Sequence, residues 1–182
     1  MEVYAKVFPP GVVNFISGAG RTTMPPIMKT GKIDIFAFIG GSTAADALLK
    51  QHPTPHKLKP CLSLDAKNLC VVMGDVDVKE AVKECITGTL SYNGQRCTAL
   101  KLLFIHTSIV DEFVKLFCEA VDAMKLALPW EDGVKLTPLP EPNKPKYLTD
   151  LIEDATSKGA KVVNGLGGLQ NGPFVRPSVL YP

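Results

Sequence analysis

The chain has 182 residues, of which 46% are hydrophobic and 21% are charged, with 20 basic and 18 acidic side chains. This composition is ordinary for a globular protein and excludes an intrinsically disordered chain. Because no Lys/Arg block stands out and no apolar run approaches the roughly 18 residues that a membrane span needs, we expect neither nucleic acid nor a membrane as a partner.

The amino terminus and the cysteines indicate a cytoplasmic protein. Met1 is followed by Glu2 rather than by a basic segment and an apolar run, so we expect no secretory signal. The five cysteines are odd in number and lack CxxC spacing, which argues against a disulfide framework and a structural zinc site. The sequence therefore predicts a reducing compartment and no bound metal.

The first third of the chain alternates apolar runs with helix-forming segments. The runs Gly11–Ser17 and Ile33–Ile39 are rich in β-branched and aromatic residues and predict strands. Arg21–Thr30, which is followed by Gly31, and Thr43–Lys50 predict the helices between and after them. This alternation is typical of a parallel sheet with crossover helices, so the predicted fold class is α/β.

The middle of the chain is predicted to contain further strands and two amphipathic helices. The expected strands are Lys57–Leu64, Leu69–Met73 and Lys101–Ile105, and the polar segment Asp65–Asn68 marks a turn or a change of domain. Asp77 is the predicted N-cap of the first helix, with Glu80 three positions on, and Ser108 is the predicted N-cap of the second. The second helix carries one apolar stripe that predicts core packing: Ile109, Val110, Phe113, Leu116, Phe117, Ala120, Val121 and Met124.

The last third begins with a rigid polar linker at Pro138–Pro145. It leads into a predicted helix, Lys146–Lys158, which Gly159 ends. Val162–Val163 and Phe174–Leu180 are predicted to be short terminal strands.

Cys97 is the candidate nucleophile. It lies in the polar, glycine-containing segment Asn93–Ala99, between a predicted helix and a predicted strand. The adjacent guanidinium of Arg96 and the N–H groups of a turn can stabilise a thiolate, although a buried, inert cysteine is the alternative. The other four cysteines lie in apolar periodic runs and are predicted to be core residues: Cys61, Cys70, Cys85 and Cys118.

Several strings resemble the aldehyde dehydrogenase superfamily, in the same order along the chain. YNGQRCTALK resembles its catalytic-cysteine motif, PGVVNFISG the strand before its cofactor loop, and FAFIGGSTAAD the strand and helix start that cradle the dinucleotide. MPPIMKTGKIDIFAFIG together with NGQRCTALK is most similar to the branch of NADP-dependent, non-phosphorylating glyceraldehyde-3-phosphate dehydrogenases. The resemblance covers essentially all 182 residues.

The resemblance implies an activity and a set of site residues. Cys97 would attack an aldehyde, expected to be glyceraldehyde 3-phosphate, and Arg96 would hold the substrate phosphate. Oxidation to the acid would then run through a thiohemiacetal and a thioester, with NADP or NAD as the cofactor. The implied cofactor contacts are Gly18, Gly40, Gly41, Ser42 and Leu64.

The resemblance also implies two domains. Residues 1–62 would be part of a Rossmann-like dinucleotide-binding domain and residues 63–182 part of the catalytic, cysteine-bearing domain. The glycines of the first part have a physical rationale, because a turn that follows a strand and opens a helix presents backbone N–H groups and the positive helix end to a phosphate.

The sequence departs from the family at the general base. The family motif LELGGK aligns with Leu62–Lys67, and the glutamate position is Ser63. A serine hydroxyl cannot take a proton from water near neutral pH, so thioester hydrolysis is expected to lose roughly 10²- to 10⁴-fold in rate. Asp65, on the same face two residues on, is the alternative base.

The chain also looks like an internal fragment, because members of this family are much longer. We expect it to lack the upstream asparagine that serves as an oxyanion donor and the downstream glutamate that holds the nicotinamide ribose. Three hypotheses stay open: a weak dehydrogenase, a catalytically impaired pseudoenzyme with a structural or interaction role, and an incomplete reading of a longer gene. Missing neighbours would leave apolar faces exposed, which favours self-association or association with a full-length relative.

Overall fold

The computed structural model describes residues 2–182, which form one unit up to Asp65 and a second from Ala66 onward. Each unit contains a pair of parallel strands connected by a helix. The predicted α/β fold class is confirmed, and with it the parallel pairing expected from the spacing of the apolar runs.

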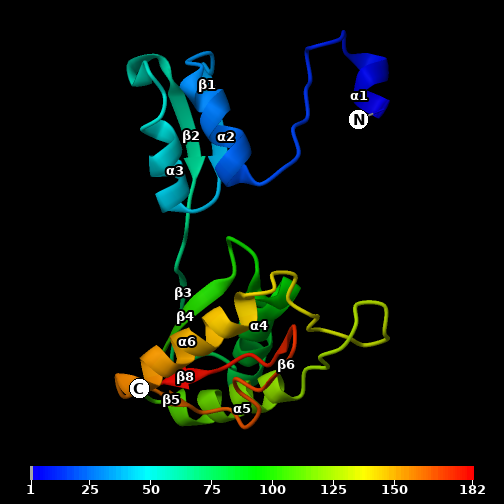
Figure 1. Ribbon diagram of the computed structural model, residues 1–182. Coiled ribbons are helices and arrows are strands. Elements are labelled where there is room, and N and C mark those ends of the chain that lie inside the picture. The colour runs from blue at the N-terminus through cyan, green and yellow to red at the C-terminus, as the bar shows by residue number, and fades with distance from the viewer. Residues whose placement is uncertain (1) are drawn as a thin grey trace. The chain divides into compact units, whose positions relative to one another are not determined.

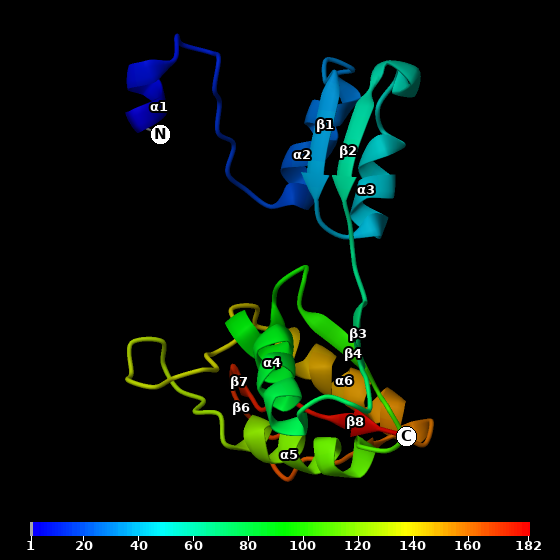
Figure 2. The ribbon, with the colours of Figure 1, turned by 180° about the vertical axis from the view of Figure 1, so that it is seen from behind.

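In the first unit, β1 (Ile35–Ile39) pairs with β2 (Lys59–Ser63), and the connection contains α3 (Ser42–Leu49) and the 3-10 turn η1 (Pro55–Lys57). α2 (Gly20–Lys29) precedes β1, and α2 and α3 cover the same face of the two strands (Figures 1 and 2). These elements confirm the strands and helices predicted for this stretch. The core between the helices and the strands consists of Met28, Phe36, Leu48 and Leu58.

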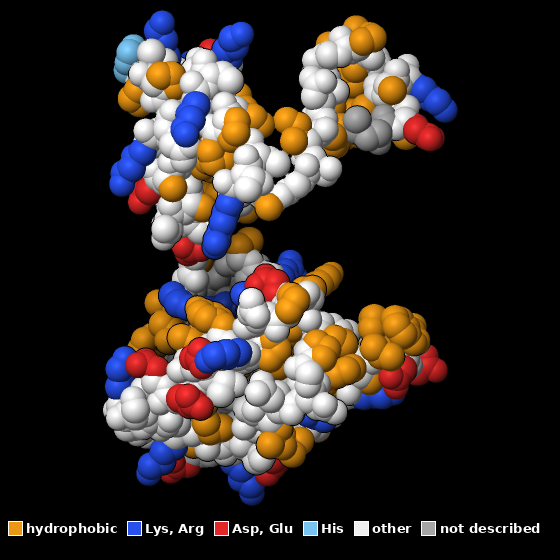
Figure 3. Space-filling view, viewed as in Figure 1, with side chains coloured by type: hydrophobic (Ala, Val, Ile, Leu, Met, Phe, Trp, Pro, Cys, Tyr) orange, Lys and Arg blue, Asp and Glu red, His pale blue; other side chains and the backbone are white. Residues whose placement is uncertain are grey.

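The other face of these strands is open to solvent. Ile35 is 63% exposed and Ile39 is 81% exposed, and Cys61, which pairs with Ala37 in register, is exposed as well. The prediction that Cys61 is a core residue is therefore wrong, because α2 and α3 lie on the opposite face. Figure 3 shows that hydrophobic side chains reach the surface in both units.

The predicted strand Gly11–Ser17 does not form. Residues 14–17 have no regular structure, and Phe15 and Ile16 are mostly exposed. A strand depends on hydrogen bonds to a partner, and no strand within residues 2–182 pairs with this run. Instead α1 (Glu2–Val7), which was not predicted, precedes it, and the ring of Tyr4 lies 5.5 Å from that of Phe15.

In the second unit, β3 (Asn68–Val72) and β4 (Leu100–Ile105) pair in parallel across α4 (Val78–Leu90). The predicted N-cap of α4 is confirmed, because the carboxylate of Asp77 accepts the backbone N–H of Glu80 at 3.0 Å. A short 3-10 segment, η2, follows α4 directly and carries the chain toward Cys97; it spans Ser91–Gly94.

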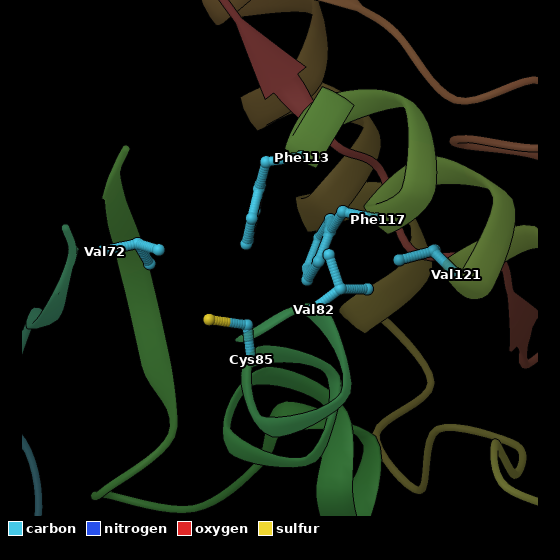
Figure 4. Close-up of a cluster of buried hydrophobic side chains, with 6 residues drawn as sticks. All are labelled: Val72, Val82, Cys85, Phe113, Phe117 and Val121. Carbon is cyan, nitrogen blue, oxygen red and sulfur yellow. The ribbon is translucent and has the colours of Figure 1, made fainter. Parts of the chain in front are cut away.

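The core of this unit lies between β3, α4 and α5 (Val110–Asp122). Figure 4 shows that side chains from all three elements converge, and the stripe predicted for α5 supplies half of them. The buried members are Val72, Val82, Cys85, Phe113, Phe117 and Val121. Cys85 is therefore a core residue as predicted, and Cys70 and Cys118 are half-buried.

The start of α5 differs from the prediction. The N-cap position is Ile109, which offers no side-chain hydrogen bond, rather than Ser108. The hydroxyl of Ser108 lies 2.8 Å from Nδ1 of His106, and its backbone N–H donates to the same nitrogen at 3.2 Å. This local pairing engages the serine in the turn before the helix.

The opposite face of the β3–β4 pair is exposed. Leu69 pairs with Leu102 and Val71 pairs with Phe104, and all four side chains are 47% to 57% exposed. Alternate residues of a strand point to opposite faces, so this apolar face is the counterpart of the one that packs on α4 and α5. The expectation of exposed apolar faces is confirmed.

The remaining elements are short except for α6 (Lys144–Ser157), which begins two residues earlier than predicted and is followed by Lys158 and by Gly159 at φ +102°. Two antiparallel pairs complete the unit: β5 (Lys161–Val162) with β8 (Leu180–Tyr181), and β6 (Gln170–Asn171) with β7 (Phe174–Val175). Within residues 2–182, none of the helices has the length and apolar character that crossing a membrane requires.

Candidate active site

Four of the five candidate cofactor residues lie at the carboxyl ends of β1 and β2: Gly40, Gly41, Ser42 and Leu64. Gly40 follows β1, and its backbone N–H donates to the carbonyl oxygen of Ser63, the last residue of β2, at 3.1 Å. Ser42 opens α3, and Leu64 follows β2. Because ligands of open α/β sheets bind at the carboxyl ends of parallel strands, this edge is the natural place for a dinucleotide phosphate.

The first turn of α3 already holds an anion from this chain. Oδ2 of Asp65 accepts the backbone N–H of Ser42 at 2.9 Å and its hydroxyl at 3.0 Å. The N-cap residue, Gly41, has no side chain to offer, so the Asp65 carboxylate caps the helix in its place. These two bonds orient the carboxylate toward α3, which argues against Asp65 as an alternative base.

Gly18 has a backbone reason to be glycine. Its φ is +146°, and a Cβ at this position would lie 2.6 Å from Cγ2 of Thr23 in α2. A side chain would therefore meet both an unfavourable backbone conformation and a steric clash. The position brings the main chain close to the first turn of α2.

Cys97 lies in an exposed turn of the second unit, between η2 and β4. The backbone N–H of Ala99 donates to the carbonyl oxygen of Arg96 at 3.1 Å, which closes the turn around Cys97 and Thr98. The thiol is thus presented to solvent by a hydrogen-bonded loop.

The segment before Cys97 has a strained backbone. Tyr92, Asn93 and Gly94 have φ angles of 55°, 58° and 68°, so three successive residues are left-handed. The conformation is unfavourable for tyrosine and needs compensation from its surroundings. Asn93 provides it through three hydrogen bonds of 2.9 Å with Thr137: its amide donates to the carbonyl and the hydroxyl, and its carbonyl accepts the backbone N–H.

Two cationic side chains also hold this loop. The guanidinium carbon of Arg96 lies 5.1 Å from the ring centroid of Tyr92, a cation–π contact. Nζ of Lys101 donates to the carbonyl oxygen of Gly94 at 2.6 Å. Burial lowers the pKa of Lys101, and the charge of the nearby Lys67 lowers it further.

Sequence reasoning found the candidate nucleophile but missed most of the residues that hold its loop. The Asn-Gly dipeptide at 93–94 is a known signal for left-handed backbone and could have indicated the turn. No sequence signal pointed to Thr137 or Lys101, since both act through contacts set by the tertiary fold.

The family model described as aldehyde dehydrogenase family matches residues 1–182. The rat protein "aldehyde dehydrogenase, cytosolic 1" is 36% identical over 174 residues, which are 94% of this chain and 34% of the relative. Human aldehyde dehydrogenase 1A1 is 38% identical over 176 residues, with the same two coverages. The chain thus spans about a third of the length of the curated relatives that it matches.

Solved structures agree with these matches. Glyceraldehyde-3-phosphate dehydrogenase GapN from Methanocaldococcus jannaschii, complexed with NADP, aligns with a TM-score of 0.86 and 26% identity over 94% of this chain and 37% of its own. The NADP-dependent glyceraldehyde-3-phosphate dehydrogenase from Bacillus halodurans, also complexed with NADP, aligns with a TM-score of 0.79 and 28% identity over 91% of this chain and 33% of its own.

Proposed function

Because this chain belongs to the aldehyde dehydrogenase family, we propose that Cys97 is its nucleophile and that it oxidises an aldehyde with NADP or NAD. The observation that carries the proposal is the exposed thiol of Cys97 in a turn that side chains on both sides hold in place. A nucleophile on a fixed loop starts its attack close to the required geometry.

The chemistry assigned to this chain begins at the sulfur atom. The Cys97 thiolate forms a bond to the carbonyl carbon, and the resulting oxyanion of the thiohemiacetal is stabilised by the backbone N–H of Cys97. When bound, the nicotinamide supplies the hydride acceptor that makes oxidation of this adduct to a thioester possible. Water then cleaves the carbon–sulfur bond, releases the acid and returns the thiol.

Hydrolysis is the step that this chain supports least. Ser63 occupies the position of the family's general base, and a hydroxyl does not accept a proton from water near neutral pH. Acylation of Cys97 should therefore be faster than deacylation, and the acyl-enzyme should accumulate.

The cofactor proposal rests on the turn at Gly40, Gly41 and Ser42. Its backbone fits a phosphate, because the first N–H groups of α3 point out of the helix at the carboxyl ends of β1 and β2. Asp65 competes with such a phosphate for the N–H of Ser42. We therefore expect weak dinucleotide binding, with Gly18 and Leu64 as the further contacts.

We propose glyceraldehyde 3-phosphate as the substrate. Two solved relatives are named as glyceraldehyde-3-phosphate dehydrogenases, and both are complexed with NADP, which favours NADP over NAD here. Arg96, next to the nucleophile, is the candidate ligand for the substrate phosphate, for which it would leave the ring of Tyr92. The name of the rat relative supports a cytosolic location.

A second candidate function is that of a catalytically impaired member of the family with a structural role. Ser63 at the general-base position favours it. Its expected partners are a second copy of this chain or a full-length relative, because apolar faces of β1–β2 and β3–β4 are exposed.

Formation of reduced nicotinamide, followed by absorbance, tests the two functions. The purified chain, after it has shown a cooperative melting transition, is mixed with glyceraldehyde 3-phosphate and NADP beside the variants Cys97→Ala and Cys61→Ala. Signal that Cys97→Ala abolishes and Cys61→Ala retains supports the enzyme. A folded chain that produces none in any variant supports the structural role.

A further inference from the structure

Asn68, the first residue of β3, reaches the loop of the candidate nucleophile. Its amide nitrogen donates to the carbonyl oxygen of Cys97 at 2.6 Å and to that of Ala99 at 3.0 Å. The partners are 29 and 31 positions away in sequence, and Ala99 is 2% exposed. Both amide hydrogens are therefore used on two carbonyls that flank Thr98.

The bonds occur at an irregularity of the strand pair. Asn68 is paired with Leu100, whereas Leu69 is paired with Leu102, so the register of β3 and β4 shifts at this point. The shift leaves Lys101 as an extra residue at the start of β4, just after the loop. Bulges of this kind change the direction in which nearby side chains point.

We infer that Asn68 is a positioning residue for Cys97. By fixing the carbonyl oxygens on both sides of Thr98, its amide fixes the Cys97–Thr98 and Ala99–Leu100 peptide planes, and with them the direction of the thiol. Lys101 and Asn93 hold the part of the loop before Cys97 through Gly94 and Thr137, and Asn68 holds the part after it. The inference rests on the proposed role of Cys97 as the nucleophile.

Alkylation by iodoacetamide measures the effect at the sulfur itself. In this reaction the Cys97 thiolate forms a carbon–sulfur bond and iodide leaves, and the rate is read for each cysteine by peptide mass spectrometry. Cys61, which is exposed in the other unit, is the internal reference. The variants are Asn68→Ala, Asn68→Asp, which keeps the shape but loses both donors, and Asn68→Ser, which keeps one donor.

The expected result is a fall in the ratio of the Cys97 rate to the Cys61 rate. Since Cys97 is already exposed, release of the loop adds little access, while the turn N–H groups that can stabilise the reacting thiolate are no longer held in place, so the rate should fall severalfold. Asn68→Ser should lie between the wild type and the other two variants. Asn164→Ala is the control: it removes amide bonds to Asp122 and Pro177 elsewhere in the unit and should lower stability without changing the ratio.

Hydrogen exchange of residues 95–99 decides the inference independently of any chemistry at Cys97. Faster exchange in this segment in the Asn68 variants, but not in Asn164→Ala, supports the positioning role. An unchanged ratio together with unchanged exchange in Asn68→Ala or Asn68→Asp would overturn it. If instead wild-type Cys97 reacts no faster than Cys61 while exchange responds to Asn68, the role of Cys97 as an activated nucleophile fails and the positioning role stands.

Discussion

The carboxylate of Asp65 accepts both the backbone N–H and the hydroxyl of Ser42, at 2.9 Å and 3.0 Å. An acidic side chain thus occupies the helix end that is proposed to receive the cofactor phosphate. Substitution Asp65→Ala should destabilise the first unit by about 1 kcal/mol, the usual effect of losing a helix cap.

The same substitution should strengthen binding of NADP. Removal of a competing negative charge at the first turn of α3 is expected to lower the Kd roughly fivefold, which corresponds to about 1 kcal/mol. Urea unfolding and calorimetric titration check the two effects. Asp46→Ala, which removes an exposed carboxylate from the body of the same helix, should leave the Kd unchanged; equal effects of the two substitutions would count against the proposed phosphate position.

Asn93 offers a test of the strained loop. Asn93→Ala removes three hydrogen bonds to Thr137 and places alanine at a φ of 58°, so the free energy of unfolding should fall by roughly 2–3 kcal/mol. Asn93→Gly loses the same bonds but tolerates the conformation, and should be about 1 kcal/mol less harmful. Chemical denaturation measures both. If glycine is as harmful as alanine, the left-handed backbone is not a source of strain.

The buried thiol of Cys85 should make the free energy of unfolding depend on pH. Burial, assisted by the neighbouring Cys70, raises the pKa of the Cys85 thiol from 9.0 to about 12. Between pH 9 and 12 the Cys85 thiol therefore keeps its proton in the folded state and loses it in the unfolded state. Its contribution to the free energy of unfolding is complete below pH 9 and is lost as the pH rises toward 12. Relative to Cys85→Ala, the wild type should lose about 1.4 kcal/mol per pH unit above pH 9. A constant difference between pH 8 and 10.5, about the upper limit of stable buffers, would contradict the burial of this thiol.

The exposed face of the β3–β4 pair predicts self-association. Val71 and Phe104 are paired in register and each is 57% exposed, and with the pair Leu69–Leu102 they form a strip of four apolar side chains. Phe104→Lys should therefore lower the apparent mass in light scattering at high protein concentration. Trp130→Lys serves as the control, since Trp130 is 77% exposed but lies outside the strip. If both substitutions lower the apparent mass equally, the association results from general insolubility and not from this face.

The pattern of apolar residues was sufficient to predict the elements that pack against something in this chain. The runs that became β1, β3 and β4 are almost continuously apolar, the stripe of α5 is strongly periodic, and each has a face buried against helices or strands. The run Gly11–Ser17 is just as apolar, yet it stays irregular because strand formation needs a partner strand, which composition does not specify. The prediction that Cys61 is a core residue was wrong for a related reason: a run of apolar residues does not reveal which face of the strand the helices cover.

The candidate site was predictable where it consists of single motifs and not where it depends on distant contacts. Cys97 stands out by its polar, glycine-containing segment. The roles of Asn68 and Thr137 depend on partners 29 to 44 positions away, and the register shift that brings Asn68 to the loop has no local signature. The bonds of Asp65 to Ser42 likewise follow from the parallel pairing of β1 and β2, not from the string around either residue.

The most direct test of Cys97 as the nucleophile is a count of reduced nicotinamide formed per chain after rapid mixing with NADP and glyceraldehyde 3-phosphate, together with the mass of the Cys97 peptide. We expect a burst of about one equivalent, an acyl group on Cys97, and slow further turnover that Ser63→Glu accelerates roughly 10²-fold or more. Continuous turnover without an acyl group on Cys97, or turnover that survives in Cys97→Ala, would contradict it.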